Sequence, residues 1–169
     1  MCLIVKVSEE GLEEGKIIPV KYIKESDGGI TCYKIVRKVG KKYITPFQET
    51  KINWPTMHGI TRFKAKGEKM GEEHHRVYEG EMAVYSGVIH SMRRLKDAEG
   101  FTDYIRNNSE WEIEIWECVI PRGVKYMEGE DGNRCACYGS ESIRFVKKVE
   151  EKYLKEWDSD SRRVPRPVL

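Results

Sequence analysis

Four polar residues near the middle of the chain have the types and spacing to bind an anion. They are His90, Ser91, Arg93 and Arg94. Ser91 is of a type that often caps helices, and the apolar residues after it recur every three or four positions, as on one helix face (Met92, Leu95, Ala98, Phe101 and Ile105). The pattern predicts a helix over residues 91–105, with both arginines in its first turn.

The two arginines oppose the partial positive charge of a helix N-terminus, at about 0.3–1 kcal/mol each when exposed. A bound phosphate or carboxylate would remove the conflict, because free backbone N–H groups and arginine side chains both donate to anions. The alternative is that Arg93 pairs with Asp97, one turn further on, while Arg94 points into water. The sequence leaves both interpretations open.

A basic segment of the chain supplies further candidates for ligand contact. Residues 31–66 contain nine basic residues and one acid, with aromatic residues among the lysines. Aromatic rings beside cations suit a ligand that has both a base and a phosphate. Trp54 precedes Pro55 in an expected loop, and loops often carry binding side chains, so Trp54 joins the predicted site. Tyr33 joins it as well, although packing within a hairpin would explain that residue equally.

One carboxylate has an unexpected position on the strand predicted at residues 111–120. Glu117 continues the apolar face of this strand, whereas Glu112 and Glu114 lie on the face that we expect to be solvated. Glu117 is therefore a weak candidate for an acid in a pocket, or for the partner of a buried cation such as Arg122, which we include in the predicted ligand site. A β-bulge that turns Glu117 outward would explain the pattern too.

The sequence predicts no metal and no cofactor. Cys135 and Cys137 lack the spacing of a common zinc knuckle, and His74 and His75 would have to approach them from another loop. No glycine-rich loop is followed by Lys-Ser or Lys-Thr. The cysteines number five, which is odd, so we expect reduced thiols rather than a disulfide framework.

The surrounding elements predict an α+β fold. Alternating apolar residues between turn signals indicate strands at residues 3–7, 17–23, 30–36, 43–45, 77–85, 111–120 and 143–149. Loops are expected at 46–55, 64–76 and 127–134, and a short C-terminal helix at 150–157. We predict a single domain over residues 1–157, built on a mostly antiparallel twisted sheet with one main helix, and a flexible tail over 158–169.

Composition and charge restrict the class of protein. The 169 residues are 39% hydrophobic and 34% charged, which fits one globular domain. Apolar runs are too short to cross a bilayer or to form a signal peptide, so we expect a cytoplasmic protein without membrane contact. Residues 97–118 carry seven acids and one base, opposite in sign to residues 31–66. Opposed charges suggest an anionic partner or contacts between copies of the chain, although solvated strand faces would explain them as well.

Several longer motifs carry a resemblance. CYKIV with YITPF after it, YSGVIHSM, and ECVIPRGVKY followed by YGSESIRFV resemble, in that order, a family of uncharacterised bacteriophage and gut-bacterial proteins. The likeness covers residues 30–149 and implies an accessory protein of a phage or mobile element, in the cytoplasm of the host. A weaker similarity is to the ADP-ribosyltransferase scaffold, in which a small residue and a glutamate, here Ser140 and Glu141, open a late strand.

We therefore expect a phage-type binding protein, not an enzyme, that sequesters a small anionic ligand. The resemblance implies that this ligand is a nucleotide signal of host immunity. Two alternatives stay open: an enzyme that processes nucleotides, with Glu117 and Glu141 as weak catalytic candidates, and an inhibitor that binds a host protein. Nucleic acid is a less expected partner, and self-association is allowed by the opposed charges.

Overall fold

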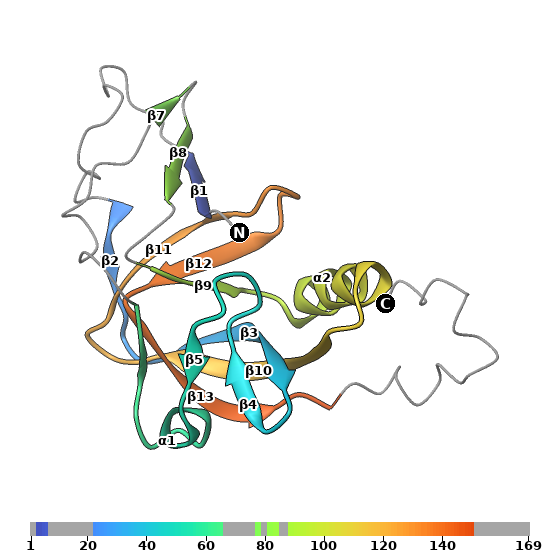
Figure 1. Ribbon diagram of the computed structural model, residues 1–169. Helices are drawn as coiled ribbons and strands as arrows, with labels where there is room; N and C mark the ends of the chain where they lie inside the picture. Colours follow the sequence, from blue (N-terminus) through green and yellow to red (C-terminus); the bar gives the residue numbers. More distant parts are fainter. Residues whose placement is uncertain (1–2, 7–21, 66–76, 79–80, 85–87, 151–169) are drawn as a thin grey trace.

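The computed structural model describes residues 3–6, 22–65, 77–78, 81–84 and 88–150 (Figure 1). Over these residues the chain forms a curled, antiparallel sheet of 13 strands with two helices, which makes it an α+β fold. The strands of the sheet follow the order β6-β13-β10-β3-β9-β12-β11-β1-β8-β7, while β2 pairs with β11, β4 with β3, and β5 with β4.

The elements have the following bounds. The first strands are β1 (Leu3–Lys6), β2 (Lys24–Glu25), β3 (Ile30–Val39), β4 (Lys42–Ile44), β5 (Lys51–Ile52) and β6 (Phe63–Lys64). The later strands are β7 (Val77–Tyr78), β8 (Glu81–Val84), β9 (Ile89–Met92), β10 (Glu112–Ile120), β11 (Lys125–Glu130), β12 (Ala136–Ser140) and β13 (Ser142–Lys148). The helices are α1 (Trp54–Met57) and α2 (Leu95–Asn108).

Strands β3 and β10 form the centre of the sheet, paired without interruption from Ile30–Ile120 to Lys38–Glu112. Both strands are rich in β-branched residues, which favour extended backbone. The pairing places the basic strand next to the acidic one, so the opposed charges of the sequence interleave on neighbouring strands. Within this part of the molecule, the basic and acidic residues do not form two separate sides.

Apolar side chains cover both faces of the central strands. A first core cluster contains Ile35, Ile115 and Met92, with Ala98 and Ile105 of α2 packed into it. A second core cluster, around Cys32 and Phe145, covers the opposite face. Residues 34–36 of β3 and 113–115 of β10 are buried on both faces, so a polar residue among them needs a specific partner.

The main helix begins four residues later than the sequence predicts. Ser91 is not its N-cap, because residues 89–92 form β9 and Ser91 pairs with Tyr138 of β12. The N-cap residue is Arg94, which has extended backbone (φ −115°, ψ 135°) and no side-chain capping hydrogen bond. The helix also ends later than the predicted residue 105, at Asn108, and Ser109 after it donates a hydrogen bond to the carbonyl oxygen of Ile105 (2.7 Å).

Two predicted loops contain regular structure. The expected extended segment at Trp54-Pro55 is the short helix α1, whose first turn accepts proline because that position needs no N–H donor. The predicted start of the loop at residue 127 was wrong, since β11 continues to Glu130. The turn that follows is held by Asp131, whose carboxylate accepts hydrogen bonds from the backbone N–H groups of Asn133 (2.8 Å) and Cys135 (2.9 Å).

Most other predicted strands are present with small changes at their ends. The hairpin of residues 30–45 is confirmed as β3 and β4, and Gly40 takes the positive φ (62°) of its turn. The single strand predicted at 77–85 is instead two short strands, β7 and β8, which pair antiparallel with each other. Most of the predicted strand at 17–23, most of the loop at 64–76, the helix at 150–157 and the tail lie outside the described residues.

Candidate functional site

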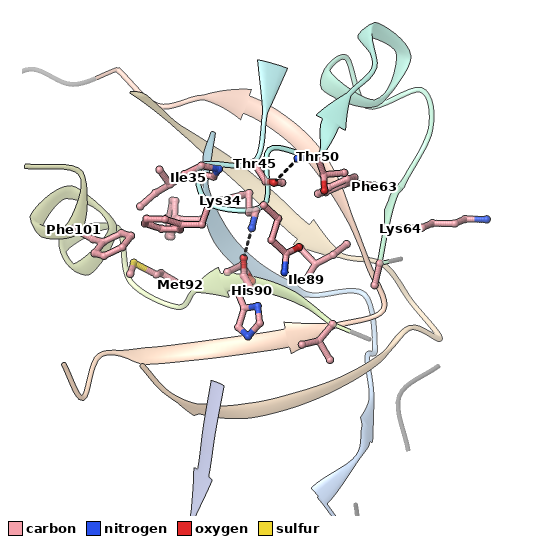
Figure 2. A pocket seen from close by; sticks show the side chains of 17 residues that line it. Lys34, Ile35, Thr45, Thr50, Phe63, Lys64, Ile89, His90, Met92 and Phe101 are labelled. Atoms are coloured by element: carbon pink, nitrogen blue, oxygen red, sulfur yellow. Dashed lines mark hydrogen bonds between the residues drawn. The ribbon is translucent and has the colours of Figure 1, made fainter. Parts of the chain in front are cut away.

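A cavity of about 140 Å³ lies where β3 and β9 meet the segment after β4 (Figure 2). Three parts of the chain form it: residues 33–35 of β3, residues 88–92 around β9, and residues 45–50 after β4. Phe63 and Phe101 contribute aromatic side chains. The cavity is partly open to solvent, and its walls combine polar and apolar side chains in similar proportion. One of the polar groups is both charged and buried.

That polar group is the ammonium of Lys34. The residue is 9% exposed, and its Nζ donates a hydrogen bond to the carbonyl oxygen of His90 (2.8 Å; Figure 2). Among the described residues, no carboxylate forms an ion pair with Lys34. Burial lowers the pKa of Lys34 to about 8, against a weaker opposing effect of the nearby Cys118 and Cys32 thiols. At neutral pH the cavity therefore contains a cation that no carboxylate of the described residues neutralises.

Lys34 was not among the predicted site residues, although the sequence contains a signal for it. Along β3, the residues on its face are apolar on both sides of it, with Cys32 two positions before and Val36 two positions after. A lysine between two buried positions of one strand face is buried as well when both faces of the strand are covered. The alternation of β3 thus indicated this cation.

An aromatic shelf extends from the mouth of the cavity, and we define it as Phe47, Phe101, Tyr104 and Trp111. Phe47 is 53% exposed, and its ring centroid lies 6.0 Å from Phe101 and 6.3 Å from Trp111. The rings of Phe101 and Tyr104 are stacked at 6.4 Å, and the guanidinium of Arg37 lies 4.1 Å from the centroid of Trp111. The ring of Phe47 is tilted against both of its neighbours, and the exposed rings of Phe47 and Tyr104 can each stack against a ring of a ligand.

The cavity contains three of the seven predicted ligand-binding residues. Tyr33, His90 and Ser91 line it. The exposed Arg93 and Arg94 do not, because they lie between β9 and α2, whereas His90 and Ser91 belong to β9 itself. The expected cradle of four residues at a helix N-terminus is therefore not formed.

The other two predicted ligand-binding residues also lie elsewhere. Trp54 is 66% exposed in α1, and its ring lies at a tilt against that of His58, with a centroid distance of 4.2 Å. Arg122 lies in the exposed turn before β11 and donates from Nε to the carbonyl oxygen of Asp27 (3.3 Å). Neither residue lines the cavity.

The predicted catalytic carboxylates do not line the cavity either. Glu117 is half-buried next to a β-bulge, which occurs between Glu117 and Cys118 in the pairing of β10 with β13. Glu141 is half-buried in the bend between β12 and β13. The cavity thus has a buried amine without a contribution from either candidate acid.

The buried carboxylate of β10 is Glu114, contrary to the prediction that its face is solvated. Glu114 is 4% exposed and accepts hydrogen bonds from the Tyr43 hydroxyl (3.1 Å) and the Trp116 indole N–H (3.1 Å), while Lys148 Nζ lies 3.7 Å away. Burial and the charge of Glu114 raise the pKa of Tyr43 to about 12. The prediction failed because β4 and Trp116 cover a face that the alternation alone leaves open.

The cysteines of the described residues are free thiols. Cys32, Cys118, Cys135 and Cys137 form no disulfide. Burial raises the pKa of Cys32 to about 11 and that of Cys137 to about 12, so these thiols are protonated at neutral pH. No group of histidine, cysteine and acidic residues suited to a metal ion occurs in the part of the chain that the structure describes, which does not include His74 and His75.

Comparison of the chain with protein-family models, curated proteins and solved structures gives no match. Neither helix among the described residues is long and apolar enough to span a membrane. The functional argument therefore depends on the geometry of the cavity and on the charge of Lys34.

Proposed function

We propose that the protein binds a small anionic organic ligand in the Lys34 cavity. The supporting observation is the buried ammonium of Lys34, which has one hydrogen-bond acceptor and no ion-pair partner among the described residues. Removing an unpaired charge from water costs several kcal/mol, and an anion within hydrogen-bond distance offsets this cost. The cavity is thus complementary to an anion from outside the described chain.

The volume of the cavity restricts the part of a ligand that enters it. A cavity of roughly 150 Å³ in another protein holds one benzene molecule. The present cavity of about 140 Å³ accordingly holds one ring or one small acidic group. For a nucleotide, which we propose as the ligand in line with the phage resemblance, the cavity takes the base or a phosphate, and the remainder lies on the aromatic shelf. Sequestration of such a signal requires affinity alone and no catalytic group.

The proposal is tested by thermal shift and calorimetry with a ligand panel. The panel contains mononucleotides, cyclic nucleotides, ADP-ribose and aromatic carboxylates. At a concentration of 100 times Kd, a ligand stabilises the folded state by about 2.7 kcal/mol, which raises Tm by several degrees. We expect at least one compound to do so, and Lys34→Met to abolish the shift.

Matched variants separate the cavity from other cations. Lys42→Met removes an exposed lysine of β4 that does not line the cavity, and Arg93→Ala with Arg94→Ala removes the arginines that the sequence favoured. Both variants should bind as the wild type does. The proposal fails if no compound stabilises the protein, or if Lys34→Met binds the same compounds with unchanged affinity.

A further inference from the structure

The nitrogen of Lys34 is poorly solvated within the described structure. An ammonium group has three N–H donors, and Nζ of Lys34 makes one hydrogen bond, to the carbonyl oxygen of His90. The residue is 9% exposed and lies between the buried Cys32 and Val36 on its strand face. This environment favours the neutral amine over the ammonium more than solvent does, and a neutral amine is a nucleophile.

The cavity gives a small molecule access to this nitrogen. It is partly open to solvent, and Ile89, Met92 and Phe101 contribute apolar side chains to its lining (Figure 2). A desolvated lysine in a pocket that a carbonyl compound can enter is the usual setting for Schiff-base chemistry.

We infer that Lys34 condenses with the carbonyl group of a small 2-oxo acid in this cavity and forms an imine. The inference rests on the proposed function, because it uses the same cavity and the same lysine. The nitrogen lone pair attacks the carbonyl carbon, and the oxygen leaves as water with the two protons of the amine. A proton from solvent then gives the iminium cation. No oxidant or reductant takes part.

A 2-oxo acid fits because its carboxylate is adjacent to the carbon that reacts. After condensation, the carboxylate neutralises the iminium within the cavity, so the bound adduct is a buried ion pair rather than a buried single charge. The other lysine at the cavity, Lys64, points away from it (Figure 2). Aromatic walls, among them Phe63 and Phe101, favour an oxo acid with a ring, such as phenylpyruvate.

The pH dependence of imine formation follows from the protonation states of Lys34 and of the groups around it. The Cys32 and Cys118 thiols near Lys34 stay protonated because burial raises their pKa values, and burial also raises the pKa of the Tyr33 phenol. His90 and Lys64 are the other titratable residues at the cavity. With the pKa of Lys34 at about 8, roughly one tenth of it is neutral at pH 7, on the order of 100 times the fraction of an ordinary lysine.

The test traps the imine on the full chain with phenylpyruvate and sodium cyanoborohydride, followed by intact mass and peptide mapping. We expect one reduced adduct, located on Lys34, that forms at least ten times faster than any adduct on exposed lysines such as Lys42. Its rate should rise about tenfold per pH unit from pH 6 to 7 and level off near 8. Adducts spread over surface lysines, with Lys34 unmodified, would overturn the inference.

A ligand pair distinguishes failure of this inference from failure of the proposed function. Phenyllactate keeps the ring and the carboxylate of phenylpyruvate but has a hydroxyl in place of the carbonyl. Stabilisation by both acids without an adduct on Lys34 would support the anion site and disprove the imine. Absence of both stabilisation and adduct would disprove the anion site and the imine together. Lys34→Met should lose the adduct, and if that variant does not fold, peptide mapping of the wild type still decides.

Discussion

The burial of Lys34 has an energetic cost that the described part of the chain offsets with a single hydrogen bond, to the carbonyl oxygen of His90. A lysine in this position weakens the fold, whereas a methionine of similar length would pack beside the buried Cys32 and Val36 without burying a charge. We interpret the residue as one whose charge and reactivity serve binding at the expense of stability. Its effect on folding can be measured without knowledge of the ligand.

Lys34→Met should raise the free energy of unfolding at pH 7, by roughly 3 kcal/mol at most, the value of a pKa shift from 10.5 to about 8. The destabilisation by Lys34 has its full value below pH 8, where the lysine is protonated in both the folded and the unfolded state. Between pH 8 and 10.5 the lysine is deprotonated in the folded state but still protonated in the unfolded state, so the wild type gains stability relative to the variant. Urea unfolding of both proteins at several pH values measures the difference. A difference that stays constant with pH would contradict this assignment.

Tyr43→Phe should lower the free energy of unfolding by about 1–3 kcal/mol, because the buried Glu114 carboxylate loses a donor. The control is Tyr104→Phe, which removes the hydroxyl of a residue that is 64% exposed and should change stability by less than about 0.5 kcal/mol. Chemical denaturation of both variants gives the comparison. Equal effects would mean that the bond to Glu114 contributes nothing.

At the scale of the elements, β9 decides where α2 begins. Residues 89–92 have their backbone groups paired with β12, so the helix starts only after the chain leaves the sheet. The N-cap is then Arg94, a residue type that cannot accept a hydrogen bond from the free N–H groups of the first turn. The helix is consequently left without a side-chain cap.

Arg94→Asp should stabilise the protein by about 0.5–2 kcal/mol, because aspartate caps the first turn and complements its partial positive charge. Arg93→Asp makes the same change of charge one residue before the N-cap, and it should stabilise the protein less than Arg94→Asp does. Thermal and urea unfolding of the two variants measure the gain. If both variants gain equally, charge rather than capping is responsible, and the helix start at Leu95 loses its support.

At the scale of the whole molecule, the central strands join the two core clusters. Ile115 belongs to the first cluster and Ile120 to the second, and both residues are 0% exposed on β10. Since β10 contributes to both clusters, loss of packing in one cluster displaces a strand on which the other cluster also depends. The two clusters should therefore unfold together.

Ile115→Ala and Ile120→Ala should each lower the free energy of unfolding by about 2–5 kcal/mol. Each should also shift the same single transition. Far-UV circular dichroism reports the sheet, and fluorescence of Trp111 and Trp116 reports the centre of the molecule. The two signals should coincide in the wild type and in both variants. Two separate transitions would show that the clusters are independent.

The sequence by itself determined the class of fold and several of its strands. Alternation of apolar residues between turn signals indicated β3, β4, β10 and β13. Apolar residues three or four positions apart indicated α2, although both of its ends lie further along the chain than predicted. These features depend on the local conformational preferences of the chain, which act over a few residues and leave a periodic pattern.

Only the tertiary structure decided which residues share a site. Ser91 became part of a strand because β12 pairs with it, and Glu114 became buried because Tyr43 and Trp116 cover its face. Lys34 entered a cavity because segments from β3, β9 and the loop after β4 meet around it. Each outcome depends on contacts between residues far apart in the chain, and the free energy of such contacts has no counterpart in local periodicity.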